Sequence, residues 1–114
     1  MRKFILAGAM VCAAGLAQAA ELSVSHCKFP DSPVVPAGAS ASDAEMAQAG
    51  ADVRDYVSGV QSSLECLTAA EESLGDDITD EQQDTLIALY NAGVDGMNAV
   101  AEQYNEEVRV FKSR

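Results

Sequence analysis

Apolar side chains recur every seven residues along much of this chain. One row consists of Met46, Val53, Val60, Leu67 and Leu74. A second row, three residues earlier, contains Val57 and Leu64, with Gly50 and Glu71 as its weak ends. This two-row spacing is typical of a long helix that packs against another helix. The pattern therefore predicts a helix over residues 42–74.

A second pair of apolar rows follows a short polar break. One row is Ile87, Val94, Ala101 and Val108, and the other is Tyr90, Met97, Tyr104 and Phe111. Leu86 and Val100 widen this apolar stripe. The pattern predicts a second helix over residues 79–112. At a rise of 1.5 Å per residue, each helix would be roughly 50 Å long.

Capping signals mark the ends of both predicted helices. Ser42 with Glu45, and Thr79 with Gln82, have the spacing of capping boxes at helix starts. Gly75 is a suitable C-cap for the first helix. Asp76, Asp77 and Ile78 are left to form a turn, and a turn this short makes consecutive helices antiparallel neighbours. The predicted fold is all-α, an antiparallel two-helix hairpin over residues 42–114 that resembles a coiled coil.

The N-terminal residues have the organisation of a signal peptide. Basic residues Arg2 and Lys3 precede an apolar run, and Ala17-Gln18-Ala19 matches the small-x-small cleavage rule. Residues 1–19 are therefore predicted to be removed on export to the periplasm. The apolar run is short for a retained membrane anchor, which needs about 20 apolar residues. Val11 before Cys12 also disfavours a lipoprotein, because a small residue is needed there.

Removal of the signal peptide changes the cysteine count and the charge. Cys12 would leave with it, so that Cys27 and Cys66 remain, and an even pair in an exported chain predicts one disulfide. A metal site is the competing interpretation, but His26 is the sole histidine and soft donors are few. The loss of two of the seven basic residues and no acid takes the net charge from −11 to −13. Such a chain should not bind nucleic acid or anionic lipid, since both would repel it.

Residues 20–41, which we call the strap, contain regularly spaced prolines and no helical period. Proline favours an extended backbone and needs no hydrogen bond from its own nitrogen. Cys66 is predicted on the outer flank of the first helix, where Gly59, Ser62 and Ser63 form a track of small residues. About 36 Å of helix separates Cys66 from Ser42, and about 46 Å of extended chain separates Cys27 from Ser42. The strap can therefore run back along the helix, with Tyr56 packed against one of its prolines, Pro30, Pro33 and Pro36.

Short motifs in residues 26–67 resemble those of a group of small exported proteins of Gram-negative bacteria. The motifs are Cys27-Lys28-Phe29-Pro30, Pro33, Pro36, Ala37-Gly38-Ala39, Asp43-Ala44-Glu45-Met46, Tyr56-Val57 and Leu64-Glu65-Cys66-Leu67. The resemblance implies a periplasmic location and a helical hairpin. It implies no activity and no catalytic residues.

The residue types in this chain disfavour an enzyme. General-base and nucleophile schemes usually need a histidine or a free cysteine, and His26 adjoins a disulfide cysteine in the strap. No cofactor motif is present. Acids are densest in residues 71–84, where a calcium-type site is an alternative to ordinary helix capping. Its candidate ligands are Asp76, Asp77, Asp80, Glu81 and Asp84.

Some apolar residues exceed what the facing rows of a lone hairpin can cover. These are Leu86, Leu89, Val100 and Val110, which predict a surface for a protein partner or a second copy, unless the strap covers part of it. The sequence thus favours a small periplasmic, non-enzymatic binding or structural protein that acts through this hairpin surface. A homodimer that forms a four-helix bundle is the simplest assembly. Divalent-cation buffering at the acidic tip is the alternative function.

Overall fold

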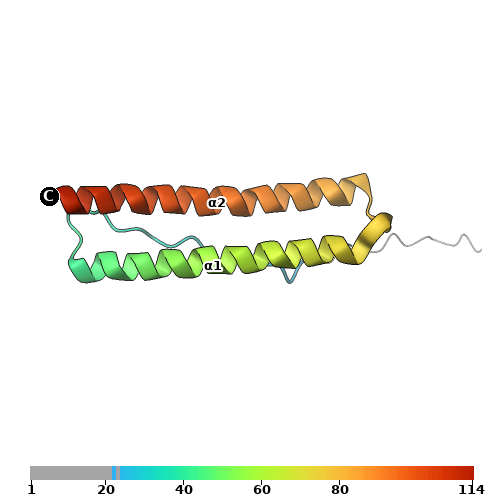
Figure 1. Ribbon diagram of the computed structural model, residues 1–114, viewed down its shortest axis with the longest axis horizontal. Helices are drawn as coiled ribbons and strands as arrows, with labels where there is room; N and C mark the ends of the chain where they lie inside the picture. The colour runs from blue at the N-terminus through green and yellow to red at the C-terminus, as the bar shows by residue number, and fades with distance from the viewer. Residues whose placement is uncertain (1–21, 23) are drawn as a thin grey trace, which may run out of the picture.

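The computed structural model describes Leu22 and residues 24–114. Helix α1 (Asp43–Leu74) and helix α2 (Asp80–Ser113) lie side by side and antiparallel, joined by the short 3₁₀ turn η1 (Gly75–Asp77), as Figure 1 shows. No strand occurs among the described residues. The all-α hairpin expected from the sequence is confirmed. The predicted signal peptide, residues 1–19, lies outside the described residues.

Both helices begin with the capping boxes that their sequences predict. The Ser42 hydroxyl accepts from the Glu45 N–H at 3.1 Å, and the Glu45 carboxylate accepts from the Ser42 N–H at 3.3 Å. Thr79 and Gln82 make the same reciprocal pair at 3.1 and 3.0 Å. Each box satisfies backbone donors that have no partner inside the helix. Local sequence alone therefore sets where each helix begins.

Gly75 ends α1 with a backbone conformation that only glycine adopts readily. Its φ is 54° and its ψ is −130°, and its N–H donates to the Glu71 carbonyl. No other described residue has a positive φ. This one position turns the chain into η1 and fixes where the two helices meet.

The first apolar row of α1 is buried as predicted. Met46, Val53, Val60, Leu67 and Leu74 are all buried, and Val60 is fully inaccessible. The second predicted row is less regular, because Leu64 is buried, Val57 and Gly50 are half-buried and Glu71 is exposed. A row outside the two predicted ones is also buried, and it consists of Ala49, Tyr56 and Ser63. The buried face of α1 is therefore wider on one flank than a two-helix seam requires.

The seam predicted for α2 was wrong by about one residue. Ile87 and Tyr90 are exposed, at 52% and 44%, and the other six members of the two predicted rows are only half-buried. The buried positions of α2 are Leu86, Gly93 and Val100. The reason is the strap, a third layer that buries one edge of the apolar stripe and leaves the opposite edge open.

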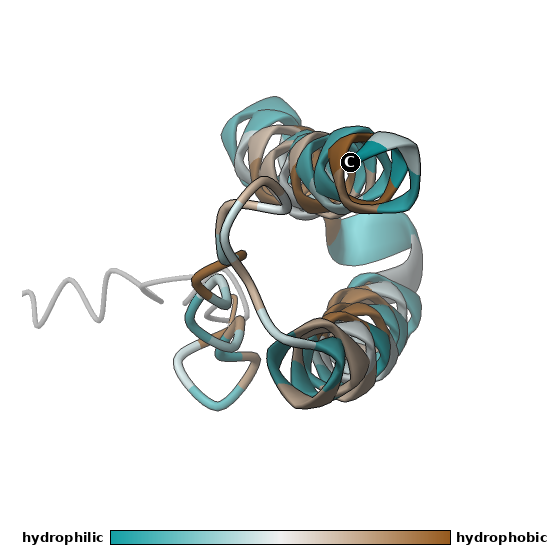
Figure 2. Cartoon of the chain, turned by 90° about the vertical axis from the view of Figure 1, so that its left-hand side faces the viewer, coloured by the Kyte–Doolittle hydropathy of each residue, from teal (hydrophilic) through white to brown (hydrophobic). Residues whose placement is uncertain are grey.

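The described part of the strap, Leu22 and residues 24–41, lies along one side of the helix pair and approaches both helices. Figure 2, an end-on view, shows it to one side of the two helices. Cys27 and Val35 of the strap belong to the same buried apolar cluster as Val60, Leu86 and Val100. The core is thus built from three segments rather than two.

Within the part of the chain that the structure describes, neither helix has a stretch apolar enough, at the length required, to cross a lipid bilayer.

Candidate functional site

Three contacts attach the strap to α1. A disulfide joins Cys27 to Cys66, with 5.5 Å between the two Cα atoms. The Ser63 hydroxyl donates to the Lys28 carbonyl at 2.6 Å. One turn further back the Pro30 ring lies so close to Gly59 that a Cβ there would be 3.0 Å from its Cγ atom. Cys66, Ser63 and Gly59 share one flank of α1, because residues three and four apart are neighbours on a helix surface.

Two further contacts carry the strap onto α2, which the sequence did not predict. Phe29 lies against Gly93, where a Cβ would be 2.5 Å from the nearest ring carbon. Near its end the strap passes Gly38 over the last turns of α2, and a Cβ on Gly38 would clash with the Glu107 carbonyl group. The expected path along α1 alone was therefore incomplete. The extra length in the strap is used to cross between the helices.

Tyr56 contacts α2, which the sequence did not predict. Its side chain is buried, and its hydroxyl lies 2.6 Å from the position that a Cβ on Gly96 would occupy. Tyr104 makes the reciprocal approach, because its hydroxyl lies 2.7 Å from the corresponding position at Gly50. Each tyrosine thus reaches across the hairpin to a glycine on the other helix.

The apolar surface predicted from four α2 residues is not an exposed patch in this chain. Leu86 and Val100 are each only 5% exposed, and Leu89 and Val110 are half-buried. The sequence pattern correctly showed that α2 carries more apolar surface than a two-helix seam covers. It selected the wrong edge of the stripe, because the path of the strap decides which edge is covered.

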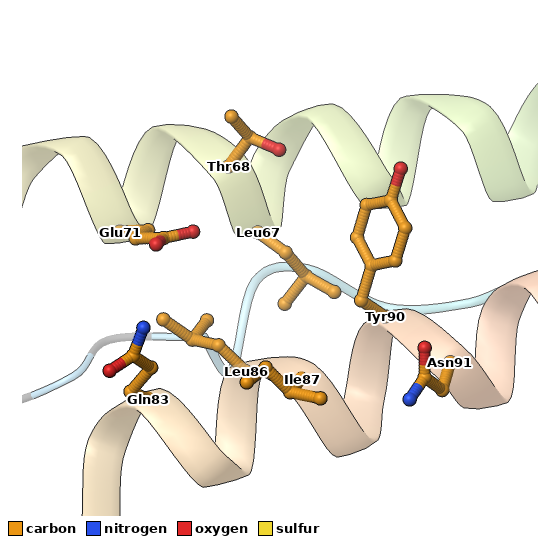
Figure 3. Close-up of a pocket in the computed structure, with 8 residues that line it drawn as sticks. All are labelled: Leu67, Thr68, Glu71, Gln83, Leu86, Ile87, Tyr90 and Asn91. Carbon is orange, nitrogen blue, oxygen red and sulfur yellow. The ribbon is translucent and has the colours of Figure 1, made fainter. Parts of the chain in front are cut away.

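The open edge forms a groove between the helices near the hairpin tip. The groove has a volume of about 150 Å³. Figure 3 shows Leu67 and Leu86 reaching toward each other from the two helices, and the Tyr90 ring extending from α2 toward α1. Its lining residues are Leu67, Thr68, Glu71, Gln83, Leu86, Ile87, Tyr90 and Asn91. We call this feature the tip groove.

A second hollow adjoins the tip groove along α1. It shares Thr68 and Tyr90 with the tip groove and extends to Gln61, Glu65 and Glu72. Thr68 lies roughly half a turn around α1 from Gly59, at 100° per residue. Since Gly59 contacts the strap, the two hollows lie on the side of the hairpin that the strap leaves open.

The charged residues that line the two hollows are all acidic. No lysine or arginine occurs between Arg54 and Arg109, a stretch that includes most of α1, the whole tip and most of α2. Three acids line the two hollows, namely Glu65, Glu71 and Glu72, and the last two are adjacent in the sequence. The tip groove therefore has an apolar floor and one acid, Glu71, on its rim, and the adjoining hollow extends this acidic rim with Glu65 and Glu72.

The acidic residues proposed as calcium ligands are all exposed. Asp76 and Asp77 lie in η1, while Asp80, Glu81 and Asp84 lie in the first turns of α2. Acids at the start of a helix stabilise it by interacting with its dipole. Among the described residues, His26, Cys27 and Cys66 are the ones whose potential metal-ligating atoms gather within 4.8 Å of one another. The two sulfur atoms in that group are bonded to each other in the disulfide.

Comparisons with protein-family models, with curated proteins and with solved structures give no match for this chain.

Proposed function

We propose that this protein is a small, exported, non-enzymatic binding or structural protein that acts through the surface of its helical hairpin. The observation that carries the proposal is the exposure of Ile87 and Tyr90 beside the tip groove. Both are large apolar residues on the edge of the α2 stripe that neither α1 nor the strap covers. Contiguous exposed apolar surface of this kind marks interaction sites in soluble proteins.

The strap supports this proposal by making a two-helix structure rigid enough to present a surface. A hairpin of this size buries little, so a covalent crosslink contributes much of its stability. The Cys27–Cys66 disulfide closes a loop with a sequence separation of 39 residues. Restricting the unfolded chain in this way contributes about 4 kcal/mol in the chain-entropy estimate. The predicted signal peptide places the mature chain in the periplasm, where such a disulfide persists.

The alternative function, calcium-type buffering at the acidic tip, depends on charge alone. The five candidate ligands are exposed, and no observation among the described residues favours a cation over solvent at these positions. We therefore place the function on the apolar open side, with a protein partner or a second copy as its ligand.

Site-specific photo-crosslinking tests the proposal directly. A benzophenone amino acid in place of Tyr90 should crosslink the exported protein to another protein in intact cells. The matched control places the same group at Val34, an apolar strap residue that is 90% exposed and lies away from the tip groove. A crosslink at Tyr90 that equals the Val34 background would contradict the proposed function.

A further inference from the structure

The tip groove has a shape that would accommodate a third helix. Its floor, Leu67 and Leu86, lies between two antiparallel helices, and its walls come from both of them. The two hollows extend along α1 from Gln61 to Glu72, which is about 17 Å, or roughly three helical turns. An amphipathic helix that binds in such a groove with its apolar face buries apolar side chains spaced three or four residues apart. Tyr90 is suited to be such a contact, since aromatic residues dominate the binding energy of protein interfaces.

Tyrosines occupy the space between the helices differently in the two halves of the hairpin. In the other half of the molecule, Tyr104 reaches across to Gly50 and occupies the space between the helices. At the tip, Tyr90 faces Thr68, and its side chain stays 44% exposed. A partner helix would therefore complete, at the tip, the packing that Tyr104 provides at the other end.

The acidic rim decides the charge of the partner. Glu65 and Glu72 border one hollow and Glu71 the other, and no basic residue of this chain stands nearby in sequence. Charge complementarity steers association and selects against partners of like charge. A second copy would bring the same acidic rim to the interface, and the whole chain already has a net charge of −11. The charge therefore favours a cationic partner over self-association.

We infer that the tip groove and the adjoining hollow bind a cationic amphipathic helix, with the apolar face of that helix on the exposed Ile87 and Tyr90 and its basic residues against Glu65, Glu71 and Glu72. This inference rests on the proposed function and names the chemistry of the partner. The helix belongs to a protein or peptide whose lysine or arginine residues flank an apolar stripe.

A synthetic peptide of about 18 residues, long enough to form a helix on binding, serves as the probe. It carries leucine at helical spacing and lysine on its polar face, and a fluorescent label reports binding by anisotropy. One control peptide replaces every lysine by glutamate. A second keeps the composition and scrambles the apolar spacing, which separates groove binding from simple charge attraction.

Variants of the oxidised mature protein locate the binding surface. Ile87→Ser and Tyr90→Ala should each raise the Kd by about tenfold, as truncation of a buried interface anchor does. Val34→Ser should leave the Kd unchanged. The pair Glu65→Gln and Glu72→Gln should raise the Kd several-fold, whereas Glu102→Gln, an exposed acid of α2 away from the groove, should not. Added salt should weaken binding to the parent protein, because exposed charge attraction is screened.

Three results would overturn the inference. They are equal Kd values for the parent and the Tyr90→Ala variant, equal binding of the lysine and glutamate peptides, and equal binding of the scrambled peptide. A crosslink from position 90 to a second copy, or to a protein without a basic amphipathic helix, would also overturn it while the proposed function stands. Loss of the position-90 crosslink to all proteins would remove the proposed function itself. Melting curves of every variant confirm that the hairpin is folded.

Discussion

The ring of Phe29 packs on the backbone of Gly93, so that the strap contacts α2 as well as the helix to which its disulfide binds it. One extended segment therefore braces both helices from the same side. Leu86 and Val100 belong to the same buried apolar cluster as Cys27 and Val35 of the strap. The uncovered side then carries the remaining apolar surface, Ile87 and Tyr90.

The close approach at Gly93 is sensitive to any added side chain. We expect Gly93→Val to lower the free energy of unfolding by about 2 kcal/mol, because overpacking displaces Phe29 and Leu64. Thermal melting followed by circular dichroism measures this effect. Ala92→Val, at the exposed neighbouring position, is the matched control. If Gly93→Val lowers the free energy of unfolding by the same amount in a Phe29→Ala background, the contact with the Phe29 ring does not cause the destabilisation.

The disulfide should contribute a large share of the stability. Cys66→Ser is expected to lower the free energy of unfolding by about 4 kcal/mol and to leave the helix content below the transition largely intact. A reductant should produce a similar loss in the parent protein and no further loss in a variant that lacks both Cys27 and Cys66. An unchanged melting temperature in Cys66→Ser would show that the strap does not brace the hairpin.

Mass spectrometry of the exported protein checks the processing and the crosslink together. Cleavage after Ala19 should leave residue 20 at the N-terminus, and digestion without reductant should yield a peptide pair joined through Cys27 and Cys66. A free thiol at either position, or a mature chain that keeps Cys12, would contradict the prediction.

The backbone of Gly75 gives a separate prediction about the turn. Gly75→Ala should lower the free energy of unfolding by about 1–3 kcal/mol, because its φ of 54° is strained for any residue with a Cβ. Open space surrounds the position, so no steric contact contributes. Asp77→Ala, in the same turn with an ordinary φ, is the control, and equal effects of the two substitutions on thermal unfolding would refute the backbone explanation.

Calcium should not stabilise the protein beyond a general salt effect. We expect equal melting temperatures in calcium chloride at millimolar concentration and in sodium chloride of the same ionic strength, since both screen the acidic surface. A calcium-specific rise that disappears in Asp80→Asn and Asp84→Asn would instead support the cation-buffering alternative, because a ligand that binds the folded state stabilises it. Asp43→Asn, at the far end of the hairpin, is the control variant.

The parts of the fold that depend on local chemistry were readable from the sequence. The capping boxes at Ser42 and Thr79, the glycine at the end of α1 and the row from Met46 to Leu74 are all as predicted. Each depends on residues within about one or two helical turns of one another. A seven-residue apolar period also identifies which helix face is buried, as long as that face meets one partner.

The candidate site was less predictable, because α2 has two partners. Its stripe is apolar over a wide arc, and periodicity alone does not say which part meets α1, which part meets the strap and which part meets solvent. An extended segment has no helical period to reveal where it lies. The nearest sequence signals were the glycines at positions 38, 59 and 93, which permit a close backbone approach but do not name what approaches.

The sequence by itself determined two capped helices, the turn between them and the residues available for a disulfide, because these follow from backbone preferences and periodicity over short distances. Only the tertiary structure decided that the strap crosses from α1 to α2 and shares one buried apolar cluster with Leu86 and Val100. That crossing leaves Ile87 and Tyr90 exposed over the tip groove. The physical reason is that α1 and the strap both pack against the one apolar stripe of α2. Which edge of the stripe each segment covers depends on the path of the strap, and tertiary contacts set that path.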